Sequence, residues 1–121
     1  MDDKCPVKII TVRFFKSASG NEPVKDWLLS LGIEDRRIVG FDIKTVEFGW
    51  PIGMPLVRKL KKDIWEVRCD ISNGRIARVL FTVIGNSMVL LHGFIKKSQK
   101  TPKSDIGTAD DRRKLVSKKV K

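Results

Sequence analysis

The first fifty residues show one strand-like segment followed by two helix-like segments. β-Branched and aromatic side chains over residues 7–15 predict the strand. Asn21 can cap the first helix, with Pro23 in its first turn and Gly32 at its end. The apolar positions of this helix have helical spacing: Val24, Trp27, Leu28 and Leu31. A second helix is predicted over 34–49, with an inner stripe formed by Ile38, Phe41, Thr45 and Phe48.

From residue 56 onward the pattern changes to the period of two that is typical of strands. Four strands are predicted, over 57–61, 64–71, 75–84 and 87–95. In the second of these strands Trp65, Val67, Cys69 and Ile71 share one side, and the other side carries Glu66, Arg68 and Asp70. Tight turns are expected at Ser72-Asn73-Gly74 and at Gly85-Asn86. The last two strands are apolar on both faces, which indicates the buried middle of a sheet.

A charged helix over 103–121 is expected to close the chain. Thr101 is predicted as its cap and Pro102 as its first helical residue. Its apolar side is thin, so we expect a frayed last turn; the apolar residues are Ile106, Ala109 and Leu115. The order β-α-α-β-β-β-β-α predicts an α+β fold, with an antiparallel sheet of four to five strands and the helices packed on one face. Residues 1–121 are expected to form one domain.

Charge gives the first functional indication. Lys and Arg total 25 against 14 acids, which is a formal net charge of +11. Such a balance favours a polyanion, with nucleic acid as the first partner to consider and an anionic membrane surface as the second. There is no apolar run long enough to span a membrane. The spacing of Cys5 and Cys69 fits no zinc site, so no metal or other cofactor is expected, and a reducing cytoplasm fits best.

An arginine in an apolar strand is the next indication. Arg78 lies in the run Ile76–Phe81, where a charge is costly unless it meets an acid or faces a site. It can form a buried pair with Glu66 or Asp70 on the neighbouring strand, or it can act on a ligand together with Arg68. The residues alone leave these two alternatives open.

The end of the last strand combines cations with an aromatic ring. Such a set suits an RNA backbone with a stacked base, although a solvated basic loop has the same composition. The RNA-binding candidates are Lys59, Phe94, Lys96, Gln99 and Lys100. His92 is the only histidine and is a weak candidate for a general base, since a satisfied histidine on a central strand is the simpler interpretation.

Four sequence segments resemble the phage-derived HigB-like toxins of the RelE/HigB superfamily. They are Gly53–Leu60, Ile64–Arg68 with its Trp-Glu-Val-Arg, Gly74–Phe81, and the segment Leu-Leu-His-Gly-Phe-Ile-Lys-Lys-Ser-Gln-Lys-Thr-Pro over 90–102. The resemblance implies a type II toxin with a RelE-like fold that cuts messenger RNA, often on the ribosome, and that pairs with a helix-turn-helix antitoxin. By position, it implies catalytic cations at Arg68, Arg78 and Lys97. The chain lacks the tyrosine of many relatives, and Glu66 stands where some of them have lysine.

A metal-independent mechanism follows from this charge pattern. RNA supplies its own nucleophile, the 2′-hydroxyl, and cations need only align it and stabilise the transition state. Glu66 is the best candidate for accepting the 2′-proton. Two other functions remain open: inhibition of gyrase by binding, as in ParE-like toxins of the same fold, and RNA binding without catalysis.

Overall fold

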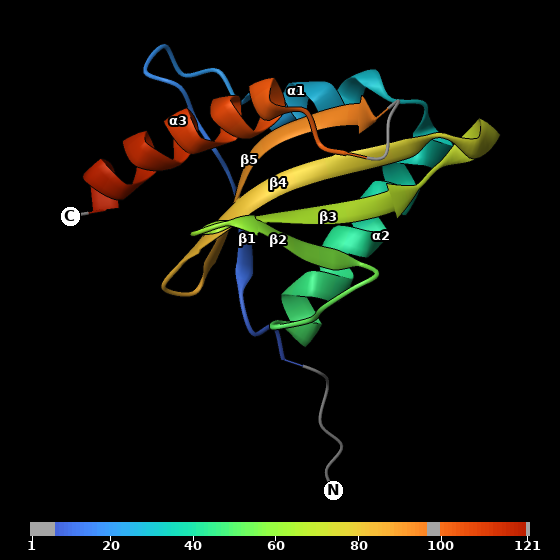
Figure 1. The fold of residues 1–121 in the computed structure, drawn as a ribbon, viewed down its shortest axis with the longest axis horizontal. Coiled ribbons are helices and arrows are strands. Elements are labelled where there is room, and N and C mark those ends of the chain that lie inside the picture. The colour runs from blue at the N-terminus through green and yellow to red at the C-terminus, as the bar shows by residue number, and fades with distance from the viewer. Residues whose placement is uncertain (1–6, 97–99, 121) are drawn as a thin grey trace, which may run out of the picture.

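The computed structural model describes residues 7–96 and 100–120. It has the element order β1 (Thr11–Phe14), α1 (Pro23–Ser30), α2 (Ile33–Gly49), β2 (Val57–Lys61), β3 (Ile64–Asp70), a 3-10 turn (Ser72–Gly74), β4 (Ile76–Ile84), β5 (Ser87–Lys96) and α3 (Lys103–Val120). The predicted α+β class and element order are therefore confirmed (Figure 1). None of these helices is both long and apolar enough to cross a bilayer, as far as the chain is described.

The five strands form one sheet in the order β1-β5-β4-β3-β2. Strands β2 to β5 are an antiparallel meander, as predicted, and β1 adds a parallel edge against β5. The strand predicted over 7–15 is shorter because the peptide N–H groups of Ile9 and Ile10 both donate to the Glu47 carbonyl at the end of α2. The parallel edge makes the sheet mixed.

Helices cover both faces of the sheet, and the expectation that they share one face is wrong. Trp27 of α1 lies against the α-carbon of Gly93 in β5, where an added Cβ would come within 2.4 Å of the ring. The neighbouring His92 points to the other face and contacts Asp105 of α3. Because successive strand residues alternate in direction, α1 and α3 lie on opposite faces. Helix α2 packs on the α1 side, against β3.

The inner stripe of α2 differs from the predicted one. Val39, Ile43 and Val46 are buried against the sheet, whereas Phe41 is 69% exposed. Both sets have helical spacing, so periodicity alone does not select the buried face.

The start of α3 also departs from its predicted cap. The helix begins at Lys103, and the Pro102 carbonyl accepts the first helical hydrogen bonds, from Asp105 and Ile106. Thr101 precedes the cap, and its hydroxyl donates to buried Glu66 instead. On the inner side of α3, Ile106, Ala109 and Val116 contact the sheet, and Leu115 is exposed.

Candidate nucleic-acid interface

Strand register places the predicted polar residues on the α3 face of the sheet. Arg68 of β3 pairs with Arg78 of β4, and Arg78 pairs with Phe94 of β5. Two positions further along, Ile76 lies opposite Lys96. On the outer side Arg58 of β2 lies opposite Glu66. These positions share one face because the side chains alternate along each strand.

Glu66 and Arg78 form a buried ion pair at the centre of this face. The Glu66 carboxyl is 1% exposed and Arg78 is 4% exposed. Nη1 of Arg78 donates to one carboxylate oxygen, and the Thr101 hydroxyl donates to the other. Of the alternatives that the sequence left open for Arg78, the structure shows the acid partner, Glu66, and it adds a third member that the sequence did not suggest.

Arg78 also faces an open space. A small hollow of about 110 Å³, here called the cation hollow, is lined by Met54, Pro55, Leu56, Arg58, Glu66, Arg68 and Arg78. The Nε of Arg78 is buried without a hydrogen-bond partner among the described residues. A buried donor left unpaired costs free energy, so the Arg78 Nε is an exception to the usual pairing of buried polar groups.

Lys96 adds a buried cation next to this hollow. It is 7% exposed, and burial lowers the pKa of its ammonium group. The positive charge of Arg78 lowers this pKa further, Glu66 opposes the change, and Arg58 and Arg68 add smaller lowering effects. Lys96 pairs with Ile76, two residues before Arg78 on β4, so it lies on the same face as the hollow.

His92 lies on the same face but is held by α3. Its Nε2 is 2.7 Å from Oδ1 of Asp105, and its ring stacks on Phe94 with centroids 5.4 Å apart. The contact ties α3 to β5. Arg112 adds a second tie, since its Nη1 donates to the Leu91 carbonyl at 2.8 Å.

The remaining sequence candidates divide into three groups. Lys59 points to the other face, where its Nζ lies 5.6 Å from the Trp65 ring, so it does not join the cation hollow. Lys97 and Gln99 lie outside the described residues. Lys100 lies at the approach to α3 and is exposed.

Sequence reasoning missed Arg58 and Thr101 as members of the site. Arg58 reads as one of several cations in a charged strand, and only its register opposite Glu66 places it at the hollow. Thr101 reads as a helix cap because Pro102 follows it. Burial of the Glu66 carboxylate, which requires hydrogen-bond donors, would have pointed to Thr101, but the sequence does not reveal that burial. In the described part of the chain no three His, Cys, Asp or Glu side chains converge as metal ligands would.

Comparison with known proteins identifies the family. Residues 26–114 match the family model described as "Phage derived protein Gp49-like (DUF891)". The chain belongs to the Gp49-like family. Two relatives, both named "Probable endoribonuclease HigB1", come from Mycobacterium tuberculosis strains CDC 1551 / Oshkosh and ATCC 25618 / H37Rv. Each is 42% identical over 59 residues, 49% of this chain and 46% of the relative, so the chain spans about half the length of the curated relatives it matches. The resemblance to HigB-like toxins is thereby confirmed.

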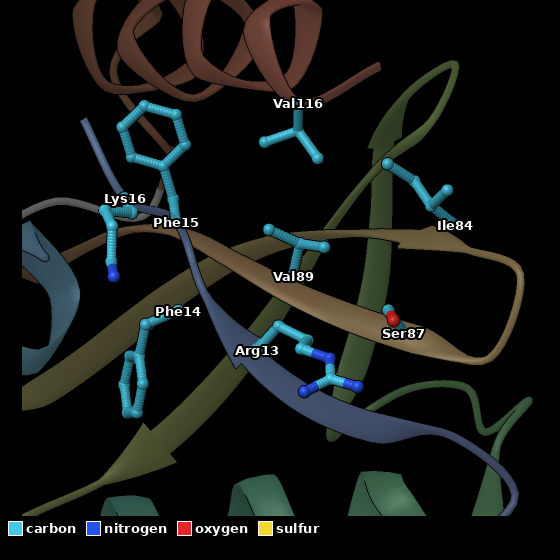
Figure 2. Close-up of a pocket in the computed structure, with 8 residues that line it drawn as sticks. All are labelled: Arg13, Phe14, Phe15, Lys16, Ile84, Ser87, Val89 and Val116. Atoms are coloured by element: carbon cyan, nitrogen blue, oxygen red, sulfur yellow. The ribbon is translucent and has the colours of Figure 1, made fainter. Parts of the chain in front are cut away.

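The Gp49-like match includes every described residue of the cation hollow. At the other end of the sheet this Gp49-like chain has a more apolar hollow of about 310 Å³ between β1, the β4–β5 turn and α3. Figure 2 shows Val116 extending from α3 toward the sheet, with Phe15 and Val89 nearby and Arg13 on β1. This apolar hollow lies near the start of β5, at Ser87 and Val89, whereas Lys96 is the last residue of that strand. The two hollows are therefore separate.

Proposed function

We propose that this protein is the toxin of a type II toxin–antitoxin system and that it cleaves messenger RNA as a metal-independent endoribonuclease. The observation that carries the proposal is that Arg78, whose Nε is buried without a hydrogen-bond partner among the described residues, lines a small hollow together with Arg58 and Arg68. The name of the two relatives and the net charge of +11 support the same activity.

In the proposed reaction the RNA 2′-oxygen attacks the adjacent phosphorus while the bond from phosphorus to the 5′-oxygen breaks. Negative charge grows on the phosphoryl oxygens as the transition state forms. Arg78 donates from its guanidinium, and Arg68, Lys96 and Lys97 supply further positive charge. A guanidinium can contact two phosphoryl oxygens at once, which fixes the phosphate as well as stabilising it.

The structure favours a positioning role for Glu66 within this scheme. Both of its carboxylate oxygens already accept hydrogen bonds, from Arg78 and Thr101, and the side chain is buried. Held in this way, Glu66 fixes the position of the Arg78 guanidinium beside the hollow. The 2′-proton then passes to water or to His92, which we keep as the weaker catalytic candidate. The 5′-oxygen leaves with the bonding electron pair and takes a proton from water, so one fragment ends in a 5′-hydroxyl and the other in a 2′,3′-cyclic phosphate.

The proposed partners follow from charge and family. We propose messenger RNA, on the ribosome, as the substrate, and a helix-turn-helix antitoxin with an acidic or mixed surface as the protein partner. The proposed location is the cytoplasm, where both are found. Induction of this protein without its antitoxin is then expected to arrest growth.

One experiment tests the activity and the site together. The protein is expressed under tight control and purified. It is then incubated with messenger RNA, with and without ribosomes, and the ends of the RNA fragments are mapped. Arg78→Ala is expected to lower cleavage by about 100- to 1000-fold, and Arg78→Lys to restore only part of it. Arg13→Ala is the matched control, because Arg13 is an exposed strand arginine at the far hollow.

Folding of each variant is checked by a thermal melt, and all assays run below the lowest midpoint. Arg58→Ala removes an exposed cation of the hollow and gives a second site variant that is expected to fold normally. A folded Arg78→Ala protein that cuts RNA at the parental rate would end the catalytic assignment. Growth arrest without any RNA cleavage would instead favour gyrase inhibition.

A further inference from the structure

A larger hollow adjoins the cation hollow at the edge of the sheet. This edge hollow measures about 530 Å³ and is lined by Ile38, Asp42, Pro55, Leu56, Arg68 and Asp70. The two hollows share Pro55, Leu56 and Arg68. They are therefore neighbours, with Arg68 between the buried Arg78 on one side and the acids on the other.

The edge hollow exists because β3 runs past the beginning of β2. Val57 pairs with Val67, and the Arg68 peptide N–H donates to the Leu56 carbonyl at 2.9 Å. Beyond this point Cys69 and Asp70 pair only with β4 in the strand register. The space that a longer β2 would fill is bordered instead by α2, which contributes Ile38 and Asp42.

Asp42 is the half-buried acid of this space. Burial raises the pKa of its carboxyl, a hydrogen bond with the Cys69 thiol lowers it, and the charge of Asp70 raises it further. A carboxylate in this setting gains from additional N–H donors, because it can accept more hydrogen bonds than the single thiol supplies. Ile38 and Leu56 offer apolar contact next to it.

We propose that the edge hollow binds a guanine base of the RNA, with Asp42 accepting hydrogen bonds from guanine N1–H and N2–H. Guanine alone among the four bases has two adjacent donors on its Watson–Crick edge, which match the two oxygens of a carboxylate. Unstacked bases of single-stranded RNA are commonly recognised on that edge. The inference rests on the proposed function, since it assigns base selectivity to the same RNA site.

The relative sizes of the hollows suit this division. The cation hollow is small and is lined by three arginines, Arg58, Arg68 and Arg78, which suits a compact phosphate group. The edge hollow is several times larger and combines apolar contacts with a carboxylate, as sites for flat polar ligands do. Arg68 can contact the connecting sugar-phosphate while its Nε lies 3.6 Å from Oδ1 of Asp70.

The test measures base preference in binding, independently of cleavage. Short 2′-O-methyl oligoribonucleotides, which lack the attacking hydroxyl, carry G, A, C or U at one position among otherwise identical residues. Affinity is measured by fluorescence anisotropy for the parental protein, for Asp42→Asn and for Glu34→Gln. Glu34 is an exposed acid of the same helix outside both hollows and is the matched control.

The parental protein is expected to prefer G by about tenfold, and Asp42→Asn to lose that preference. An amide presents one acceptor and one donor, which match adenine, so Asp42→Asn is expected to shift the preference toward A. If Asp42 has only a structural role, Asp42→Asn will lower the affinity for all four RNAs equally, and that result would overturn the inference. Equal affinity of the parental protein for the four RNAs would also overturn it. Selective G binding without cleavage of ordinary RNA would uphold the guanine site and contradict the proposed endoribonuclease activity.

Discussion

Glu66 and Arg78 lie diagonally across β3 and β4 on the same face of the sheet, and each neutralises the buried charge of the other. Register places Glu66 opposite Leu80 and Arg78 opposite Arg68. The ion pair therefore joins β3 and β4 at the point where the strand register places Arg68 opposite Arg78. A buried pair of this kind is strongly coupled to stability, because removal of one partner leaves an uncompensated charge.

Loss of Arg78 alone is expected to destabilise the protein more than loss of the whole pair. Arg78→Met should lower the free energy of unfolding by about 3–5 kcal/mol, since Glu66 is then buried with the Thr101 hydroxyl as its remaining partner. Glu66→Leu/Arg78→Met should recover much of that loss. Urea unfolding of the two single variants and the double variant measures the coupling. Strict additivity would show that the two side chains do not depend on each other.

The Thr101 hydroxyl is expected to contribute to the same network. Thr101→Val keeps the shape but leaves an oxygen of Glu66 without its donor, so the free energy of unfolding should fall by about 1–3 kcal/mol. Thr101→Ser retains the hydroxyl and is the matched control. Chemical denaturation of both variants is the measurement, and equal stability of the valine and serine proteins would contradict the assignment.

RNA affinity is expected to fall steeply as salt concentration rises, because each phosphate contact releases counterions. Arg58→Gln should reduce the slope of log affinity against log salt by about 0.7, the value for one contact with a single strand. Arg13→Gln, at the far hollow, should leave the slope unchanged. Titration of a fluorescent RNA at several salt concentrations gives the slopes. A flat parental curve would rule out recognition through phosphates.

Asp35 predicts a defined acid dependence of stability. It accepts hydrogen bonds from the Ser72 peptide N–H at 2.9 Å and from Arg75 Nη2 at 2.6 Å. The Ser72 backbone bond is the main cause that lowers the pKa of Asp35 below 3.8, and burial partly opposes it. A lowered folded-state pKa stabilises the fold above the unfolded pKa, and this contribution is lost as the pH falls through the folded value.

Asp35→Asn should therefore melt below the parental protein at neutral pH, and the gap should narrow as the pH falls below 3.8. Thermal melts over a pH series provide the measurement. Glu34→Gln, which changes an exposed acid one residue away, should show no such convergence. A gap that is constant with pH would mean that the Asp35 charge does not contribute.

Gly93 is expected to tolerate no side chain. An added Cβ would lie 2.4 Å from the Trp27 ring, so Gly93→Ala should cost roughly 1–3 kcal/mol through overpacking. Gly40→Ala is the control: it lies in α2 with nothing within 4 Å of the added Cβ and should stabilise by up to about 1 kcal/mol. Trp27→Leu/Gly93→Ala should regain part of the loss. The midpoints of unfolding are the measurement. A Gly93→Ala protein as stable as the parental protein would contradict the close contact.

The sequence determined most of the fold because local patterns correspond to local structure. Alternation in 64–71 separated Val67 and Cys69 from Glu66 and Arg68, as the structure confirms. The turns at Asn73 and Gly85 follow from the positive φ angles that these residues adopt readily. Where two apolar stripes competed, as on α2, periodicity could not choose between them, because burial depends on what the helix packs against.

By itself the sequence determined the family, the strongly basic charge and the strand cations Arg68 and Arg78. Only the tertiary structure decided that Arg78 is buried against Glu66, that Thr101 joins this pair, and that Arg58 lies at the same hollow. It also decided that Lys59 faces Trp65, away from the other cations. The physical reason is that charge-bearing residues interact through strand register and helix docking, and these depend on contacts between segments far apart in the chain.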